Sequence, residues 1–315
     1  MLDSRLNEAE RPVQPKFSFF SGLCLILLPF LLISAAQWLR SLPDRAPRTP
    51  GAAAVRFEPV RVAGAAGAWA VEVNDPRFGG VSALALRSGR LLALTDSGVL
   101  VDLPQPGPGG RATLRELPDG PGSPSRKSAR DSESLTWDGR GERWWVGFEN
   151  RHSLWAFDRQ FRQALAQVDL GGQGWPVNRG AEALVARAND GLLLLPETAG
   201  TVVELSRKGL ISRPLAGVSG GVTDAVTLPS GRILVLVREI GPLGIRNRLT
   251  LLERTRAGAR LRPLRRVAVG PLTNLEAAAA EPLPSGATRL WVMSDNDFSS
   301  WRRTILLAID LPRGL

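Results

Sequence analysis

Carboxylate residues recur along the sequence at matching points of a repeated pattern, and their type and spacing are the clearest sign of chemistry. An acidic residue stands near the start of an apolar run in DSESLTW (131–137), NRGAEALV (178–185), GGVTDAVTL (220–228) and NLEAAAA (274–280). The run GGVSALAL (79–86) has the same form, with Ser82 in the acidic place. A repeat of this length is typical of stacked or radial units, so these acids are expected at equivalent points of those units.

Each of these runs is followed by a second apolar run that also ends in polar residues. The second runs are LLALTDSG (91–98), WWVGFEN (144–150), LLLLPE (192–197), ILVLVRE (233–239) and LWVMSDND (290–297). If the two runs are antiparallel neighbours, the start of the first and the end of the second lie at the same end of the unit. The carboxylates of all the units are then expected around one opening.

Carboxylates that converge in this way repel one another unless they bind cations or pair with arginine. Oxygen ligands suit Ca²⁺ or Mg²⁺ rather than a soft metal, and calcium is the predicted ion. The predicted metal ligands are Glu133, Glu276, Asp224, Asp96, Glu149, Glu197 and Asp295. The alternative is an architectural role, in which the acids cap loop amides and pair with arginines.

A metal-assisted phosphoester hydrolase uses cations to neutralise the phosphate and to activate a water molecule. In that interpretation Glu182 and Arg179 are the catalytic pair, with Glu182 orienting the water. Arg238 and Arg302 would bind the phosphate oxygens of the substrate. No organic cofactor is expected.

The elements that must position these residues are strands. After residue 55 short runs rich in Val, Leu and Trp alternate with Gly, Pro, Asp and Asn, which is typical of an all-β fold. The repeats begin near residues 80, 131, 180, 221 and 274, and each has strand signals for four strands, as in a β-propeller blade. We therefore predict an all-β β-propeller over residues 55–315, with five four-stranded blades favoured and six as the alternative.

Two stretches of the predicted propeller do not match the repeat. The last repeat has only three strands before the chain ends, and residues 55–75 are expected to supply the missing outer strand and close the ring. Residues 104–130 are rich in Gly, Pro and Ser, so we expect a long loop there with little structure of its own.

The N-terminal part of the chain indicates export. Residues 1–16 are polar, and residues 17–39 form an uncharged apolar stretch long enough to span a bilayer. This stretch is either a signal peptide or a retained transmembrane anchor to the inner membrane, and residues 40–54 are expected to be a linker. The remaining chain is expected in the periplasm or outside the cell.

Composition excludes several classes of site. A single Cys and a single His rule out disulfides within the chain and multi-histidine metal sites. The net charge of +10 comes almost wholly from scattered Arg, which suits a small anionic substrate such as a phosphate ester but not nucleic acid. The string GVSGG (217–221) matches a serine-hydrolase motif, but it leads into a predicted strand and lacks the required helix.

Taken together, FGGVSALAL…LLALTDSG, DSESLTW…WWVGFEN, NRGAEALV…LLLLPE, RILVLVRE and NLEAAAA…LWVMSDNDF resemble the family called esterase-like activity of phytase. The resemblance covers about residues 55–315. It implies a β-propeller similar to calcium-dependent alkaline phytases, with Glu133, Glu182 and Glu276 as motif glutamates and Asp96, Glu149, Glu197, Asp295 and Asn296 as strand-end polar residues. Ser134, Ala183 and Ala277 replace the glycines that usually follow the family's acidic residues.

A function of a different class also fits the same residues. The propeller could be a non-catalytic module of the cell envelope that binds a ligand or a protein and uses calcium only for stability. Under this alternative, substitution of Glu182 or Glu276 changes stability without abolishing any turnover.

Overall fold

The computed structural model describes residues 50–124, 126–187, 191–198, 200–217 and 219–315. These residues hold 21 strands and two short 3₁₀ segments, η1 (Lys127–Ala129) and η2 (Gly171–Gln173), and no α-helix. No helix of this part is long and apolar enough to cross a membrane. The predicted signal or anchor at residues 17–39 lies outside the described residues.

Hydrogen bonding groups the strands into consecutive antiparallel sets of four. The first set is β3 (Val81–Arg87), β4 (Arg90–Thr95), β5 (Val99–Leu103) and β6 (Gly110–Glu116), and the second is β7 (Ser132–Asp138), β8 (Arg143–Phe148), β9 (Ser153–Asp158) and β10 (Ala164–Asp169). The third is β11 (Ala181–Ala186), β12 (Leu192–Pro196), β13 (Thr201–Ser206) and β14 (Gly209–Ala216). The fourth is β15 (Gly221–Thr227), β16 (Ile233–Gly241), β17 (Gly244–Arg254) and β18 (Ala259–Val267).

The last set closes the ring with a strand from the other end of the domain. It contains β19 (Asn274–Pro282), β20 (Thr288–Asp295) and β21 (Thr304–Leu311), and β2 (Gly67–Val73) pairs with β21 as the outer strand. The predicted contribution of residues 55–75 to an outer strand is thus confirmed. The extra strand β1 (Gly51–Pro59) joins β2 to β6, and β14 pairs in parallel with β18.

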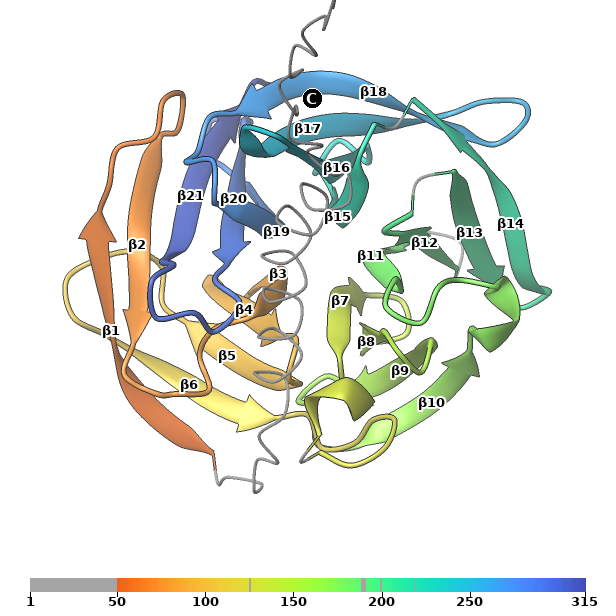
Figure 1. Cartoon of the computed structure of the whole chain (residues 1–315), viewed down its shortest axis with the longest axis horizontal. Coiled ribbons are helices and arrows are strands. Elements are labelled where there is room, and N and C mark those ends of the chain that lie inside the picture. Colours follow the sequence, from red (N-terminus) through yellow and green to blue (C-terminus); the bar gives the residue numbers. More distant parts are fainter. Residues whose placement is uncertain (1–49, 125, 188–190, 199, 218) are drawn as a thin grey trace, which may run out of the picture. The chain divides into compact units, whose positions relative to one another are not determined.

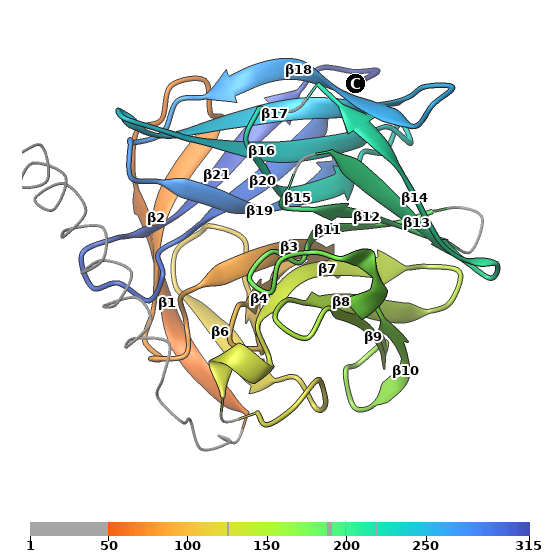
Figure 2. The same ribbon diagram turned by 45° about the vertical axis from the view of Figure 1, so that its right-hand side comes forward.

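The first strands of the sets are innermost. β3, β7, β11, β15 and β19 contact one another in turn, and β19 returns to β3, so they form a closed ring (Figure 1). Figure 2 shows the strands of each set lying side by side outward from this ring. The fold is an all-β β-propeller. The pairing is what five four-stranded blades would produce, and the blade number itself stays a prediction.

Apolar packing between neighbouring sets holds the ring together. Leu92 and Leu94 of β4 pack with Trp144 and Phe148 of β8 in one such cluster, and all four are nearly inaccessible to solvent. Burying a side chain of this size contributes about 1.5–3 kcal/mol. The nearly continuous apolar runs read in the sequence are therefore strands covered on both faces.

Two expectations about unstructured segments are wrong. Residues 51–54 of the predicted linker belong to β1, since they pair with β6 from Gly51↔Leu114 to Ala54↔Arg111. The predicted loop 104–130 contains all of β6 and the segment η1. The Gly- and Pro-rich flanks of β6 conceal a strand because its pairing with β5 and β1 overrides the local composition.

Candidate functional site

The five innermost strands share a β-bulge that places one residue of each strand at an equivalent point. The ladder between the first and second strand of each set skips one residue of the first strand. A bulge of this kind bends the strand and re-aims the extra side chain. The bulge residues are Ser82, Glu133, Glu182, Thr223 and Glu276.

A second group of equivalent residues lies at or near the end of the second strand of each set, opposite the start of the first strand. The N–H groups of Asp96 and Glu149 donate to the carbonyl oxygens of Gly80 (2.7 Å) and Asp131 (2.8 Å), just before the bulge. In the other three sets, the pairing of the first strand with the second identifies the residue at the same position. The whole group is Asp96, Glu149, Glu197, Arg238 and Asp295. Four acids and one arginine therefore surround one end of the innermost strands, which we call the mouth.

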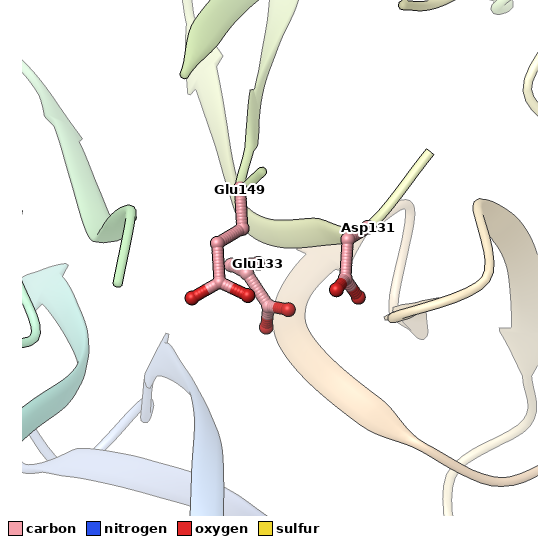
Figure 3. A group of neighbouring side chains, drawn as sticks. All are labelled: Asp131, Glu133 and Glu149. Carbon is pink, nitrogen blue, oxygen red and sulfur yellow. The ribbon is translucent and has the colours of Figure 1, made fainter. Parts of the chain in front are cut away.

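Three carboxylates of the second set form a candidate metal centre. One oxygen each from Asp131, Glu133 and Glu149 lies within 4.8 Å of the other two. In Figure 3 the three side chains extend in the same direction from the start of β7 and the end of β8. Calcium binds oxygens at 2.3–2.6 Å, so two oxygens on one ion are at most about 5 Å apart. The donor set and spacing fit a calcium ion.

A lysine of the segment η1 lies beside this cluster. The Lys127 ammonium is 2.8 Å from Asp131 Oδ1 and 3.1 Å from Asp96 Oδ2. Asn150 Nδ2 donates to the other Asp131 oxygen at 2.7 Å. Burial lowers the pKa of Lys127, but the charges of Asp96 and Asp131 outweigh it and raise the pKa above its usual value. Lys127 is therefore a fixed positive charge between two acids.

On the other side of the mouth, Arg238 takes the place of an acid. Its guanidinium donates to Glu276 Oε1 at 2.5 Å and to Glu197 Oε1 at 2.8 Å. Burial acts to lower the pKa of Arg238, while the charges of Glu276 and Glu197 raise it. The Asn274 amide also donates to Glu276. Arg238 therefore supplies this half of the mouth with an internal cation.

The acids at the mouth hold their protons more tightly than free carboxyl groups. Burial and the charges of neighbouring acids raise the pKa of Glu149 to about 8 and that of Glu182 well above its usual range. Burial and the charge of Asp131 likewise raise the pKa of Glu133. Burial raises the pKa of Asp96 to about 7, although the Lys127 charge acts against it. Most of these groups raise one another's pKa, so they form one electrostatically coupled set.

Asp295 and Asp96 occupy a corner of the mouth where backbone approaches closely. Burial and the charge of Glu276 raise the pKa of Asp295, whose Oδ1 accepts the N–H of Asp297 at 2.7 Å. Asp96 Oδ1 is buried without a hydrogen-bond partner, and a Cβ on Gly80 would lie 2.5 Å from it. Gly80 has a φ of +55°, so glycine meets both a steric and a conformational need there.

Asp224 is placed differently from the other predicted ligands. The bulge makes Thr223 the counterpart of Glu133, and Asp224 is the next residue along the strand. Its Oδ1 accepts the N–H of Ala225 and its Oδ2 that of Ala278, both at 2.7 Å. Asp224 is buried and connects β15 to β19, so the structure gives it an architectural position.

Two further predicted arginines pair with acids at or beside the mouth: Arg179, predicted to be catalytic, and Arg302, predicted to bind substrate. Arg179, whose side chain is 47% exposed, is 3.6 Å from Glu197. Arg302 pairs with Asp297 and its guanidinium lies 4.7 Å from the ring centre of the exposed Trp301. Arg238 is less accessible, with 18% of its side chain exposed.

Sequence reasoning did not assign the residues that complete the candidate metal centre. Asp131 stands in the first motif but was passed over because Glu133 is the residue that aligns with the other repeats. Asn150 and Lys127 could have been noticed only from their closeness in sequence to Glu149 and Asp131. Lys127 belongs to η1, inside a segment expected to have no structure.

Comparison with solved structures finds distant likenesses. Myxococcus xanthus glutaminyl cyclase is 15% identical with a TM-score of 0.44, covering 85% of this chain and 100% of that one. Virginiamycin B lyase from Staphylococcus aureus is 9% identical with a TM-score of 0.42, covering 81% and 99%. Kuenenia stuttgartiensis hydrazine synthase is 10% identical with a TM-score of 0.39, and this chain covers 59% of it while 72% of this chain is matched. Likenesses at these TM-scores carry no argument about function.

Comparison of the sequence with proteins of established annotation finds no match. A family model does match: the phytase-like model described as esterase-like activity of phytase covers residues 76–298. That range includes the bulge residues, the strand-end acids and Lys127. The chain therefore belongs to the phytase-like family, esterase-like activity of phytase.

Proposed function

We propose that the chain is a calcium-dependent hydrolase of phosphate esters that acts at the carboxylate-lined mouth of the propeller. The observation that carries the proposal is the candidate metal centre, in which Asp131, Glu133 and Glu149 offer oxygens within 4.8 Å of one another. Membership of the phytase-like family supports the reaction class. A phosphate ester also suits the arginines around the mouth, since guanidinium groups bind phosphate oxygens in pairs.

Asp131, Glu133 and Glu149 would hold the calcium ion. A bound calcium ion supplies positive charge that offsets the phosphate and lowers the pKa of a bound water molecule. The protein's part is to keep three carboxylates together despite their repulsion. It does so by fixing Asp131 between Lys127 and Asn150 and by seating Glu133 on the bulge of β7.

Glu182 is the proposed catalytic carboxyl group. Burial and the charges of Glu149 and Glu276 raise its pKa, which favours the protonated form. A protonated carboxyl group can donate its proton to the oxygen of a leaving alcohol. We therefore propose proton donation as its role, in place of the water-orienting role expected from the sequence.

Arg179 and Arg302 are proposed to bind the phosphate oxygens, since both pair with acids at or beside the mouth. Arg179 is the more accessible of the two and has only a 3.6 Å contact with Glu197. Arg238 is engaged with Glu197 and Glu276. We therefore assign it to holding these acids in place.

The test is hydrolysis of p-nitrophenyl phosphate and phytate by the purified protein, with calcium and with EDTA. Turnover that needs calcium and is lost in Glu133→Gln and Glu182→Gln supports the proposal. Glu253→Gln is the matched control, because Glu253 lies on the outer strand β17 and pairs with Arg260 and Arg262. Calcium-independent turnover, or turnover retained in Glu182→Gln, contradicts it.

A non-catalytic calcium-binding module is the second candidate, and one observation favours it. Arg238 and Lys127 already neutralise much of the mouth, and both Asp131 oxygens accept hydrogen bonds. This candidate predicts a calcium-dependent rise of the melting temperature with no hydrolysis of either ester. Export to the periplasm or cell surface is part of both candidates and follows from residues 17–39.

A further inference from the structure

A cavity of about 490 Å³ lies between the first and second strand sets, away from the mouth. Four arginines line it: Arg87, Arg90, Arg115 and Arg162. The buried side chains of Leu92 and Leu100 also line it. The cavity is within the size range of pockets that bind small molecules.

This arginine pocket is at the opposite end of the strands from the candidate metal centre. The β3–β4 ladder runs from Val81↔Thr95, next to the mouth, to Arg87↔Arg90 at the hairpin. Six residues of extended strand separate the two ends, which is about 20 Å. The turn that carries Arg162 is likewise at the far end of β9, since β9 starts from Ser153 paired with Phe148. The arginine pocket and the mouth are therefore separate sites.

The pocket holds positive charge that the protein does not neutralise. Arg90 pairs with Asp102, the acidic residue of the lining. Among the described residues, Arg87, Arg115 and Arg162 have no ion pair with an acid. Burial, and then the charge of Arg87, lower the pKa of Arg115, while the charges of Asp102 and Asp158 act in the opposite direction. The nearby Asp158 has both oxygens occupied by N–H groups of its own turn.

The wall behind Arg115 is rigid. The Arg115 guanidinium carbon lies 5.5 Å from the ring centre of Phe161, and that ring stacks on Trp144 at 5.4 Å. Phe161 is buried and has a φ of +53°, a conformation that a bulky residue adopts only when its surroundings impose it. Arg115 is thereby held at the pocket without an acidic partner, as a preorganised anion site requires.

We propose that the arginine pocket binds a small organic phosphate. The unpaired guanidinium groups of Arg87, Arg115 and Arg162 match the oxygens of a phosphate group. Leu92 and Leu100 provide apolar surface for the carbon skeleton. The pocket is independent of calcium and of the reaction proposed at the mouth.

The experiment is isothermal titration of phenyl phosphate and of inorganic phosphate into the purified protein. The buffer is freed of metals with a chelating resin, because EDTA is itself a polyanion that would compete. Phenyl phosphate is expected to bind with one site, and more tightly than inorganic phosphate. Arg162→Gln and Arg87→Gln are each expected to weaken the binding about tenfold or more, as for loss of a charged hydrogen bond.

Two controls locate the binding. Arg260→Gln removes an arginine of the outer strand β18 that pairs with Glu253, and it should leave the affinity unchanged. Glu133→Gln alters the mouth and should also leave it unchanged. Arg115→Gln is followed by thermal unfolding, since its contact with Phe161 supports the wall. Absence of binding, equal affinity for the two phosphates, or unaltered binding in Arg162→Gln and Arg87→Gln would overturn the proposal.

Discussion

The two halves of the mouth use the same backbone positions for different electrostatics. In the second set the bulge and the strand end carry Glu133 and Glu149, and Asp131 joins them to form the candidate metal centre. In the fourth set the same two positions carry Thr223 and Arg238, and Arg238 pairs with Glu197 and Glu276. Each half contains a cation of its own, Arg238 in one and Lys127 in the other, but only the second set brings three carboxylates together. The side chain at a fixed backbone position thus decides whether a carboxylate or a cation faces the mouth.

The largest expected effect comes from removing the internal cation. Arg238→Met leaves Glu197 and Glu276 without their partner, and the loss of one member of a buried ion pair costs about 3–5 kcal/mol. The free energy of unfolding from urea titration measures this. Arg260→Met is the control, where an exposed pair should change it by less than about 1 kcal/mol. If the free energy of unfolding falls by the same small amount in both variants, the two halves of the mouth do not differ as described.

A smaller loss is expected for Asp224→Asn, which tests whether this acid belongs to the fold or to the metal site. An asparagine amide can accept only one of the two N–H groups that Asp224 binds, so the variant should lose about 1–3 kcal/mol of stability. Calcium affinity, measured by titration calorimetry, should be unchanged. Weaker calcium binding by a folded variant would indicate that Asp224 is a metal ligand after all.

Removal of an acid from the other half should act in the opposite direction. Glu133→Gln removes a carboxyl group whose ionisation is opposed by burial and by the charge of Asp131, so the calcium-free variant should be at least as stable as the unsubstituted protein, and increasingly so as pH rises. Its calcium affinity should fall, because one of three carboxylate ligands is gone. Thermal unfolding without calcium measures the stability of the calcium-free variant, and its shift on adding calcium measures the calcium affinity. A variant that is less stable without calcium would show that Glu133 is held by favourable contacts.

The effect of pH is the most gradual. Asp96 and Glu149 have a folded pKa of about 7 and about 8, above the unfolded values. Such groups favour the folded state fully below the unfolded pKa, and this contribution is lost as pH rises through the folded pKa. The calcium-free protein should therefore lose stability between about pH 4 and pH 8, and calcium should reverse most of the loss. A melting temperature that is flat or rising over this range would contradict the raised pKa values.

The repeated motifs were enough to predict the all-β propeller and most acids at the mouth. Matching repeats by their acidic residue located Glu133, Glu182 and Glu276 at bulge positions. The same rule selected Asp224, although the bulge residue of β15 is Thr223. The acid of this repeat lies one residue after the bulge, and the sequence alone does not reveal that difference. In the fourth repeat the second apolar run ends in Glu239, which pairs with Arg248, but the residue equivalent to Glu149 is Arg238.

Residues brought in from outside the repeats could not be predicted. Lys127 comes from a segment whose composition indicates a loop, and only the fold places it between Asp96 and Asp131. The arginine pocket depends on a turn of one set meeting a hairpin of the next. Its arginines are dispersed through the sequence, so no run of positive charge indicates a binding site.

The pairing of β2 with β21 has a consequence for the time course of biosynthesis. Residue 67 is synthesised long before its partner, residue 308. Contacts between such distant residues form slowly, because a long loop must close before they gain any stability. Until then the edges of β2 and β21 are exposed to other chains. The synthesis of β21 therefore decides when the free edge of β2 is protected from aggregation.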